Sequence, residues 1–157
     1  MSIFEIFTDG SIHPEERRAG WAYYAESDDC AAAHSGFIEN CKDVGTAEFR
    51  AVVSGLGFAA VFSWARLQQG VAFVVWTDSL EVVAWRNQIG KCKREKFNDC
   101  IERMIEIEKL IGVGGGSIEI RLMTPEQKHR SVEHQLCHNL ARKAARHGRG
   151  KTGNLYP

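Results

Sequence analysis

The segment from Ile3 to Ser11 is the sequence feature that most constrains the fold. It begins with the β-favouring run Ile-Phe-Glu-Ile-Phe and continues directly into Thr8, Asp9 and Gly10. This pattern predicts a buried first strand that ends by carrying Asp9 to the edge of a sheet, where Gly10 lets the backbone approach a ligand. A carboxylate held there is costly unless it binds a cation or hydrogen-bond donors. The alternative is an Asp-Gly turn that closes a hairpin.

Length and composition point to one globular domain. The chain has 157 residues, of which 44% are hydrophobic and 25% charged, as in ordinary globular proteins. Apolar runs such as 58–64 are too short to span a bilayer, and the amino end lacks a basic segment followed by an apolar one. Five cysteines without a Cys-x-x-Cys pair fit reduced thiols. We therefore expect a cytoplasmic monomer that contacts no membrane and needs no protein partner.

Charge is unevenly distributed along the chain although the formal net charge is zero. Residues 1–50 contain 4 basic and 10 acidic residues, a net charge of −6, whereas residues 121–157 contain 8 basic and 2 acidic residues, a net charge of +6. This polarity fits an acidic side that binds metal ions and a basic side that binds a polyanion. The alternative is that folding brings the two halves together and cancels the asymmetry.

The order of the expected elements predicts an α/β fold. Strand-like segments at 3–9, 19–25 and 31–39, joined by polar turns, predict an antiparallel meander. A helix over 47–68 follows, and its Gly55 and Gly57 indicate close packing on the sheet. We then expect a strand at 71–76, helices at 80–88 and 96–111, a strand at 118–123 and a helix at 132–146. The result is a mixed five-stranded sheet with helices on both faces over residues 1–147, followed by a flexible basic tail over 148–157.

Three acidic residues from distant parts of the chain are expected to meet. Asp9 and Asp78 each follow a strand, and these two strands can be parallel neighbours, while Glu48 lies in the first turn of the helix that crosses the same edge. Three converging carboxylates repel one another unless a divalent cation neutralises them. Hard carboxylate oxygens suit Mg²⁺ or Mn²⁺.

Four motifs in this order resemble the type 1 ribonuclease H family: Phe-Thr-Asp-Gly-Ser at 7–11, Ala-Glu-Phe-Arg-Ala at 47–51, Trp-Thr-Asp-Ser at 76–79 and Leu-Cys-His-Asn-Leu-Ala-Arg at 136–142. The resemblance covers residues 3–146. It implies a ribonuclease H-like fold and an endoribonuclease that hydrolyses the RNA strand of RNA–DNA hybrids with two Mg²⁺ or Mn²⁺ ions, leaving 5′-phosphate and 3′-hydroxyl ends. Three of the family's four catalytic carboxylates fall on Asp9, Glu48 and Asp78.

The fourth catalytic position falls on His138, where the family has an aspartate. The resemblance implies that Asp9 bridges the two ions, that His138 holds the ion that activates water, and that Glu48 and Asp78 hold the other ion. Imidazole can ligate a divalent metal and is softer than a carboxylate, so we expect Mn²⁺ to be favoured over Mg²⁺ more than usual. The alternative is that His138 is a solvated helix residue in an inactive relative.

The resemblance also implies residues that handle protons and substrate. The family has a histidine on the mobile loop before the last helix, a role that His129 fits and for which His134 competes. Backbone amides of Gly10 and Ser11 are expected to contact the RNA strand, and Thr46 lies near a position where the family usually has asparagine. Basic, amide and aromatic side chains are expected to hold the DNA strand: Trp85, Asn87, Lys91, Lys93 and Arg94.

Two other functions fit the same sequence. One is a 3′–5′ exonuclease of the same fold, although such enzymes typically carry Asp-x-Glu on the first strand and Asp9-Gly10-Ser11 lacks the second acid. The other is a nucleic-acid-binding module that lost turnover with its fourth carboxylate.

Overall fold

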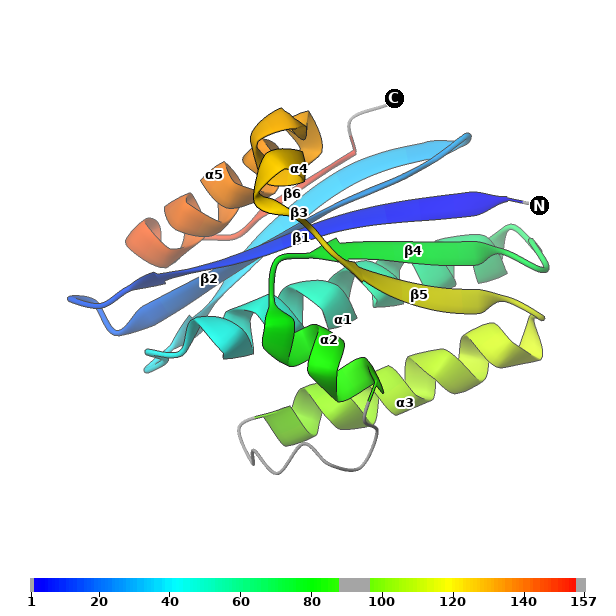
Figure 1. Cartoon of the computed structure of the whole chain (residues 1–157), viewed down its shortest axis with the longest axis horizontal. Coiled ribbons are helices and arrows are strands. Elements are labelled where there is room, and N and C mark those ends of the chain that lie inside the picture. Colours follow the sequence, from blue (N-terminus) through cyan, green and yellow to red (C-terminus); the bar gives the residue numbers. More distant parts are fainter. Residues whose placement is uncertain (1, 88–96, 155–157) are drawn as a thin grey trace.

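A computed structural model of the chain describes residues 2–87 and 97–154, with side chains described up to Ala84 and again from Phe97 to Gly150. The strands form one six-stranded sheet in the order β5-β4-β1-β2-β3-β6 (Figure 1). Their bounds are β1 Ile3–His13, β2 Arg18–Ser27, β3 Cys30–Glu39, β4 Ala72–Thr77, β5 Ser117–Leu122 and β6 Lys151–Asn154. The β1–β2 and β2–β3 pairs are antiparallel, whereas β1–β4 and β4–β5 are parallel. The five strands expected from the sequence are all present.

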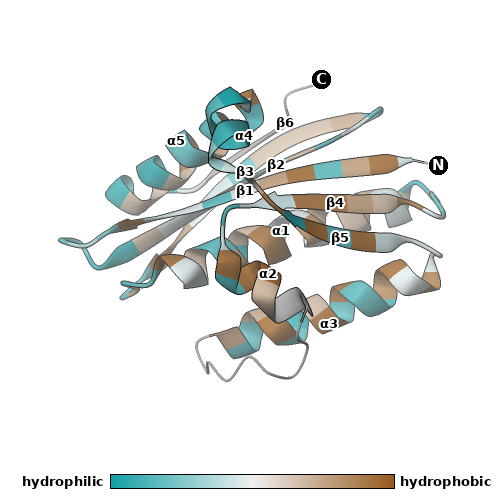
Figure 2. Ribbon diagram, viewed as in Figure 1, coloured by the Kyte–Doolittle hydropathy of each residue, from teal (hydrophilic) through white to brown (hydrophobic). Residues whose placement is uncertain are grey.

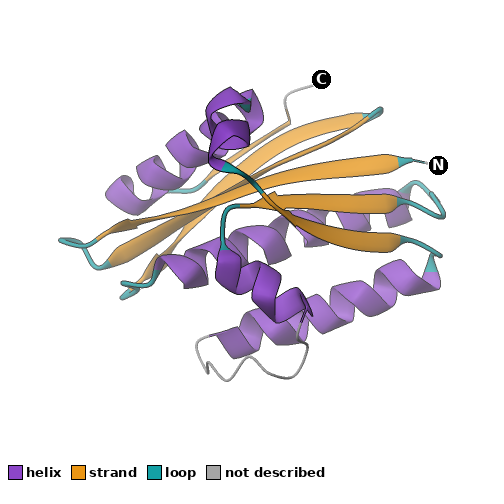
Figure 3. Cartoon of the chain, in the orientation of Figure 1, coloured by secondary structure: helices purple, strands orange, loops and turns teal. Residues whose placement is uncertain are grey.

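Helices cover both faces of this sheet, as predicted. On one face lie α1 Val44–Ala65, α2 Leu80–Asn87 and α3 Asn98–Val113, and on the other lies α5 Val132–His147 with the short α4 Pro125–Arg130 beside it (Figures 1 and 3). In Figure 2, hydrophobic residues lie mainly on the strands and α1, whereas α4 and the visible side of α5 are mostly hydrophilic.

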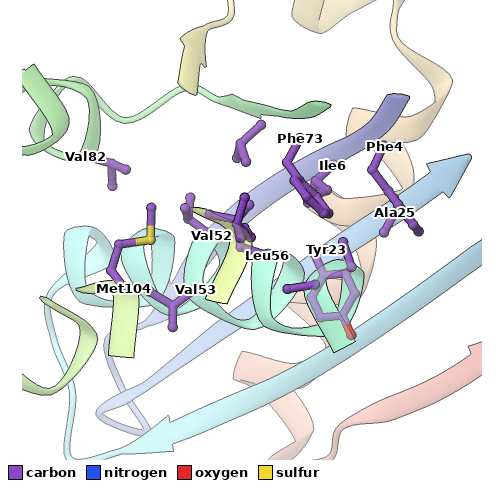
Figure 4. Close-up of a cluster of buried hydrophobic side chains, with 14 of the residues drawn as sticks. Phe4, Ile6, Tyr23, Ala25, Val52, Val53, Leu56, Phe73, Val82 and Met104 are labelled. Carbon is purple, nitrogen blue, oxygen red and sulfur yellow. The ribbon is translucent and has the colours of Figure 1, made fainter. Parts of the chain in front are cut away.

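Two hydrophobic cores follow from the alternation of side chains along β1. Phe4 and Ile6 point toward α1 and join the larger core, which includes Leu56 and reaches Met104 of α3 (Figure 4). Phe7 points the other way and joins the smaller core under α5. Because successive side chains of a strand alternate between faces, one strand supplies both cores. Helix α1 is apolar and long enough to cross a membrane, yet 61% of its most apolar 18-residue stretch is buried inside the domain.

Two glycines let the helices approach the sheet closely. A Cβ on Gly20 of β2 would collide with the carbonyl oxygen of Ala141, so α5 lies directly on this strand. A Cβ on Gly55 of α1 would lie 2.6 Å from a methyl carbon of Ile6, which confirms the predicted close packing at that position. The prediction is wrong for Gly57, whose nearest neighbour is Ile107 of α3 at 3.6 Å.

Among the differences from the sequence prediction, three lie near the predicted acidic site. Strand β1 continues to His13, because β2 pairs with it from Glu5 to His13, so Asp9 lies within the strand and not at its end. Helix α1 begins three residues earlier, at Val44, because the Asp43 carboxylate caps it by accepting a hydrogen bond from the Thr46 amide. Residues 125–130 form the helix α4 in place of a loop.

The segment after Gly148 is also corrected. We predicted a flexible tail over 148–157, but Lys151–Asn154 forms β6 and pairs antiparallel with β3 from Ala32 to Ser35. Edge strand β3 offers unpaired backbone groups, and these can hold a short segment that has no hydrophobic pattern of its own.

Candidate metal centre

Strand pairing explains why Asp9 can take part in a site although it lies within β1. The parallel pairing of β1 with β4 ends at Phe7 and Trp76, whereas the pairing of β1 with β2 continues to His13. Asp78 follows β4 directly. It therefore lies beside the part of β1 after Phe7, which no longer pairs with β4. The two aspartates therefore come together as predicted, and Asp9 is only 3% exposed.

Glu48 reaches the same place from α1. It is buried in the second turn of that helix, which lies against β1 at Gly10. A Cβ on Gly10 would be only 2.8 Å from the Glu48 backbone nitrogen. Gly10 thus has a structural reason to be glycine in addition to the predicted contact with a ligand: it admits the start of α1.

The three carboxylates have strongly perturbed acidities. Burial, helped by hydrogen bonding to Asp78 and by the charges of Asp78 and Asp9, raises the pKa of Glu48 to about 10. Burial and the Asp78 charge also raise the pKa of Asp9. For Asp78, burial acts upward but hydrogen bonds from Glu48 and Lys128 outweigh it, so its pKa is lowered. Without a metal ion, Glu48 therefore holds a proton at neutral pH beside a charged Asp78.

Lys128 supplies a positive charge that the sequence interpretation did not place in the site. Its Nζ lies 2.9 Å from Oδ2 of Asp78, and this contact raises the pKa of Lys128. Helix α4 fixes the position of Lys128: Thr124 caps the helix, and Gln127 completes a reciprocal capping box. In the sequence, the capping pattern of Thr124 and Gln127 and the proline at position 125 are signals for the start of this helix.

Helix α5 contributes two histidines, one turn apart. Nδ1 of His138 lies 2.8 Å from Oδ2 of Asp9, so the structure brings His138 to the predicted site. His134 is 4% exposed, and its Nδ1 is buried without a hydrogen-bond partner. One ligand atom each of Asp9, Asp78 and His134 lie within 4.8 Å of one another. The spacing of 134 and 138, which puts both side chains on one side of a helix, could have revealed His134.

The start of α5 fixes the orientation of these histidines. Ser131 caps the helix and accepts a hydrogen bond from the His134 amide at 3.0 Å. Between the two histidines, the buried Cys137 thiol donates to the Phe7 carbonyl oxygen at 3.3 Å. Burial lowers the pKa of His134, with the Asp9 and Asp78 charges acting in the opposite direction. A neutral imidazole is the form that can ligate a metal.

The other predicted site residues are only partly brought together. The Thr46 hydroxyl donates to the Asp43 carboxylate at 2.7 Å and so belongs to the α1 cap. Ser11 lies two residues beyond Asp9 in β1, opposite Gly20. His129 is exposed on α4, one residue from Lys128, and not on a loop. The side chains of Trp85 and Asn87, and the whole of Lys91, Lys93 and Arg94, lie outside the described residues.

The donor set suits a divalent cation. Carboxylate oxygens of Glu48 and Asp78 and a ring nitrogen of His134 are buried without partners among the described residues. Such atoms are costly to leave unpaired, and bound divalent ions could supply their missing partners. We conclude that the residues present fit a metal centre built from oxygen and nitrogen ligands.

The architecture and the position of this centre define a class of fold. The five strands β1–β5, three antiparallel and then two parallel, with helices on both faces, form a ribonuclease H-like fold. No protein-family model matches the chain. No curated protein matches it either.

Several solved structures of ribonucleases H are similar to this chain. The chain is similar to the N-terminal ribonuclease H domain of a Mycobacterium tuberculosis protein, with a TM-score of 0.67 and 18% identity over 93% of this chain and 95% of that one. It is also similar to ribonuclease H1 of Halobacterium salinarum, with a TM-score of 0.65 and 17% identity over 90% and 96% of the two chains. A third, LC11 ribonuclease H1 bound to an RNA/DNA hybrid, has a TM-score of 0.66 and 17% identity over 90% and 98%. At these identities, the similarity establishes the fold.

Proposed function

We propose that the protein is a metal-dependent endoribonuclease that hydrolyses the RNA strand of RNA–DNA hybrids. The observation that carries this proposal is that three acids from distant segments meet in a ribonuclease H-like fold. Oxygens of Asp9 and Asp78 lie within 4.8 Å of one another, and buried Glu48 interacts with both residues. Crowded carboxylates with unpartnered oxygens have little structural use, because they repel one another and destabilise the protein. One of the similar structures holds an RNA/DNA hybrid, which supports the substrate class.

Asp9, Glu48, Asp78 and His138 would hold the divalent ions. Two bound Mg²⁺ or Mn²⁺ ions would supply an activated water and would stabilise charge on the scissile phosphate. Asp9 would take the central position, because it contacts His138 at 2.8 Å and one of its oxygens lies within 4.8 Å of ligand atoms of both Asp78 and His134. His138 either ligates directly or orients the Asp9 carboxylate through their 2.8 Å contact. Glu48 would hold a cation as the ionised carboxylate, so it would have to give up its proton to ligate.

The remaining residues are proposed to position the hybrid. Backbone amides of Gly10 and Ser11 would contact the RNA strand beside Asp9, and exposed His129 would handle protons or product release from α4. The basic stretch around Lys91, Lys93 and Arg94 would contact the DNA strand through its phosphates. A cytoplasmic location and a monomeric state remain predictions from the sequence.

Incubating the protein with labelled substrates would test the proposal. An RNA–DNA hybrid, an RNA duplex, a DNA duplex and the single strands would each be incubated with Mg²⁺ or Mn²⁺. We expect internal cuts in the RNA of the hybrid alone, ending in 5′-phosphate and 3′-hydroxyl. Asp9→Asn should lower the rate by at least about 10³-fold. Equal rates for wild type and Asp9→Asn would identify a contaminating nuclease, and stepwise shortening from the 3′ end would favour an exonuclease.

A second candidate, a nucleic-acid-binding module without turnover, is favoured by one contact. The Lys128 ammonium group lies 2.9 Å from the Asp78 carboxylate. Its positive charge offsets part of the repulsion among the acids, which a bound metal ion would otherwise offset. This candidate predicts that the protein binds hybrid equally well with Mg²⁺ or with a chelator, and that neither ion supports cleavage. Gel-shift and cleavage assays on the same preparation distinguish the two candidates.

A further inference from the structure

His134 is a buried polar residue of α5 with a ring nitrogen that has no hydrogen-bond partner among the described residues. It lies on α5 with 4% of its surface exposed, and no described residue hydrogen-bonds to its Nδ1. An unpaired polar atom in the interior destabilises the folded protein. A hydrophobic residue or alanine would fill this helix position without that cost. The described residues therefore leave the imidazole without a partner for this nitrogen.

The position of His134 indicates what this partner is. One ring nitrogen of His134 and one oxygen each of Asp9 and Asp78 lie within 4.8 Å of one another, so a single ion placed among them could contact all three. His138, one turn further along α5, reaches Asp9 in another way: its Nδ1 lies 2.8 Å from Oδ2 of Asp9, and its side chain is 43% exposed. The two histidines thus approach Asp9 in different ways: His138 as a hydrogen-bonding neighbour, His134 as an interior donor.

We propose that His134 is a nitrogen ligand of a transition-metal ion held between Asp9 and Asp78. Two carboxylates and one imidazole form a mixed oxygen and nitrogen donor set, which binds Mn²⁺, Co²⁺ or Zn²⁺ in preference to Mg²⁺. The inference deepens the proposed function, since it names the class of ion that this site selects. It concerns binding, so it can be tested without cleavage.

The test is a set of calorimetric titrations of the full chain with Mg²⁺, Mn²⁺ and Co²⁺, together with the visible absorption of bound Co²⁺. Three proteins would be compared: wild type, His134→Ala and His147→Ala. His147 is the matched control, because it is an exposed histidine at the other end of the same helix. We expect His134→Ala to weaken Mn²⁺ and Co²⁺ binding by at least about tenfold and to alter the Co²⁺ spectrum. We expect less than about a threefold change for Mg²⁺, which prefers oxygen ligands and water. His147→Ala should match wild type.

Unchanged Mn²⁺ and Co²⁺ affinities in His134→Ala would overturn the inference. Thermal unfolding without metal checks that the variant is folded, and His134→Gln replaces it if it is not. A wild-type measurement is independent of any variant: the ring nitrogens of His134 should shift in ¹⁵N spectra when Zn²⁺ is added, and unshifted signals would also overturn the inference. Selective loss of Mn²⁺ and Co²⁺ binding without hybrid cleavage by wild type would leave this inference standing and refute the proposed function. A wild type that binds none of these ions would refute both.

Discussion

At the scale of single residues, Glu48 is the group of the candidate centre whose ionisation most destabilises the metal-free protein. The buried Glu48 carboxyl holds a proton in the folded protein because burial and Asp78 raise its pKa to about 10. In the unfolded chain the same group has an ordinary pKa near 4.5. The folded state therefore binds one more proton than the unfolded state between these values. The stability of the metal-free protein must fall as pH rises through this window.

Glu48→Gln should remove this dependence. The glutamine keeps the size and a hydrogen-bond donor, but it has no charge to suppress. At about pH 8 with a chelator present, we expect the variant to be more stable than wild type by roughly 2 kcal/mol or more, and near pH 4 the difference should vanish. Urea unfolding across the pH range measures both curves. Parallel curves for the two proteins would show that Glu48 ionises normally.

Lys128 stabilises the metal-free site, whereas ionised Glu48 destabilises it. The Lys128 ammonium group lies 2.9 Å from the Asp78 carboxylate. A cation that uses Asp78 must displace this ammonium group and overcome its repulsion. Lys128→Met should therefore raise Mn²⁺ affinity severalfold, on the order of 1 kcal/mol. The pair is partly exposed, which limits the effect. Calorimetric titration measures the affinity, and exposed Arg130→Met on the same helix is the control. A lower affinity in Lys128→Met would mean that Lys128 supports the bound state.

At the scale of elements, the site depends on how closely two helices approach the sheet. Helix α5 carries His134 and His138 and lies on β2 at Gly20, where no side chain fits under Ala141. Helix α1 carries Glu48 and lies on β1 at Gly10 and at Gly55. The positions of these side chains are therefore set by glycines on the strands and in α1, as well as by the helices' own sequences.

Gly20→Ala should be strongly destabilising, because its methyl group would collide with the Ala141 backbone and push α5 away from β2. We expect a loss of about 2–4 kcal/mol in the free energy of unfolding, with weaker metal binding. Gly57→Ala is the matched control. Its methyl group would meet only Ile107 at an ordinary 3.6 Å, and alanine favours a helix by about 0.5–1 kcal/mol over glycine. Chemical denaturation compares them, and equal effects would contradict the role given to Gly20.

At the scale of the whole molecule, β6 and the candidate centre lie at different parts of the sheet. Strands β3 and β2 separate β6 from β1, and β4 lies beyond β1. The backbone of β6 covers the edge of β3, so β6 contributes to the stability of the domain without reaching the carboxylates.

A chain ending at Gly150 should therefore lose stability and keep its metal centre. We expect the free energy of unfolding to fall by roughly 1 kcal/mol, because a four-residue edge strand adds little burial and a few hydrogen bonds. Mn²⁺ affinity should be unchanged. Thermal unfolding and calorimetric titration of the shortened chain provide the two measurements. A shortened chain with normal stability but weaker Mn²⁺ binding would contradict this separation.

Local pattern was sufficient for much of this protein. Apolar alternation and helical periodicity marked five strands and the main helices, since burial of one face imposes a period that can be read along the chain. The acids Asp9, Glu48 and Asp78 could be assigned to one site because each lies near an end of a predicted strand or helix. The order of these elements brings their ends together at one edge of the sheet.

Contacts between distant segments decided the rest. Pairing with β2 extends β1 past Asp9, pairing with β3 orders Lys151–Asn154, and α4 brings Lys128 to Asp78. None of these leaves a periodic pattern, because each depends on a partner far away in the chain. The same holds for His134, whose type and spacing are written in the sequence. Its burial and its unpaired nitrogen exist only once α5 lies on the sheet, and these features distinguish it from a surface histidine.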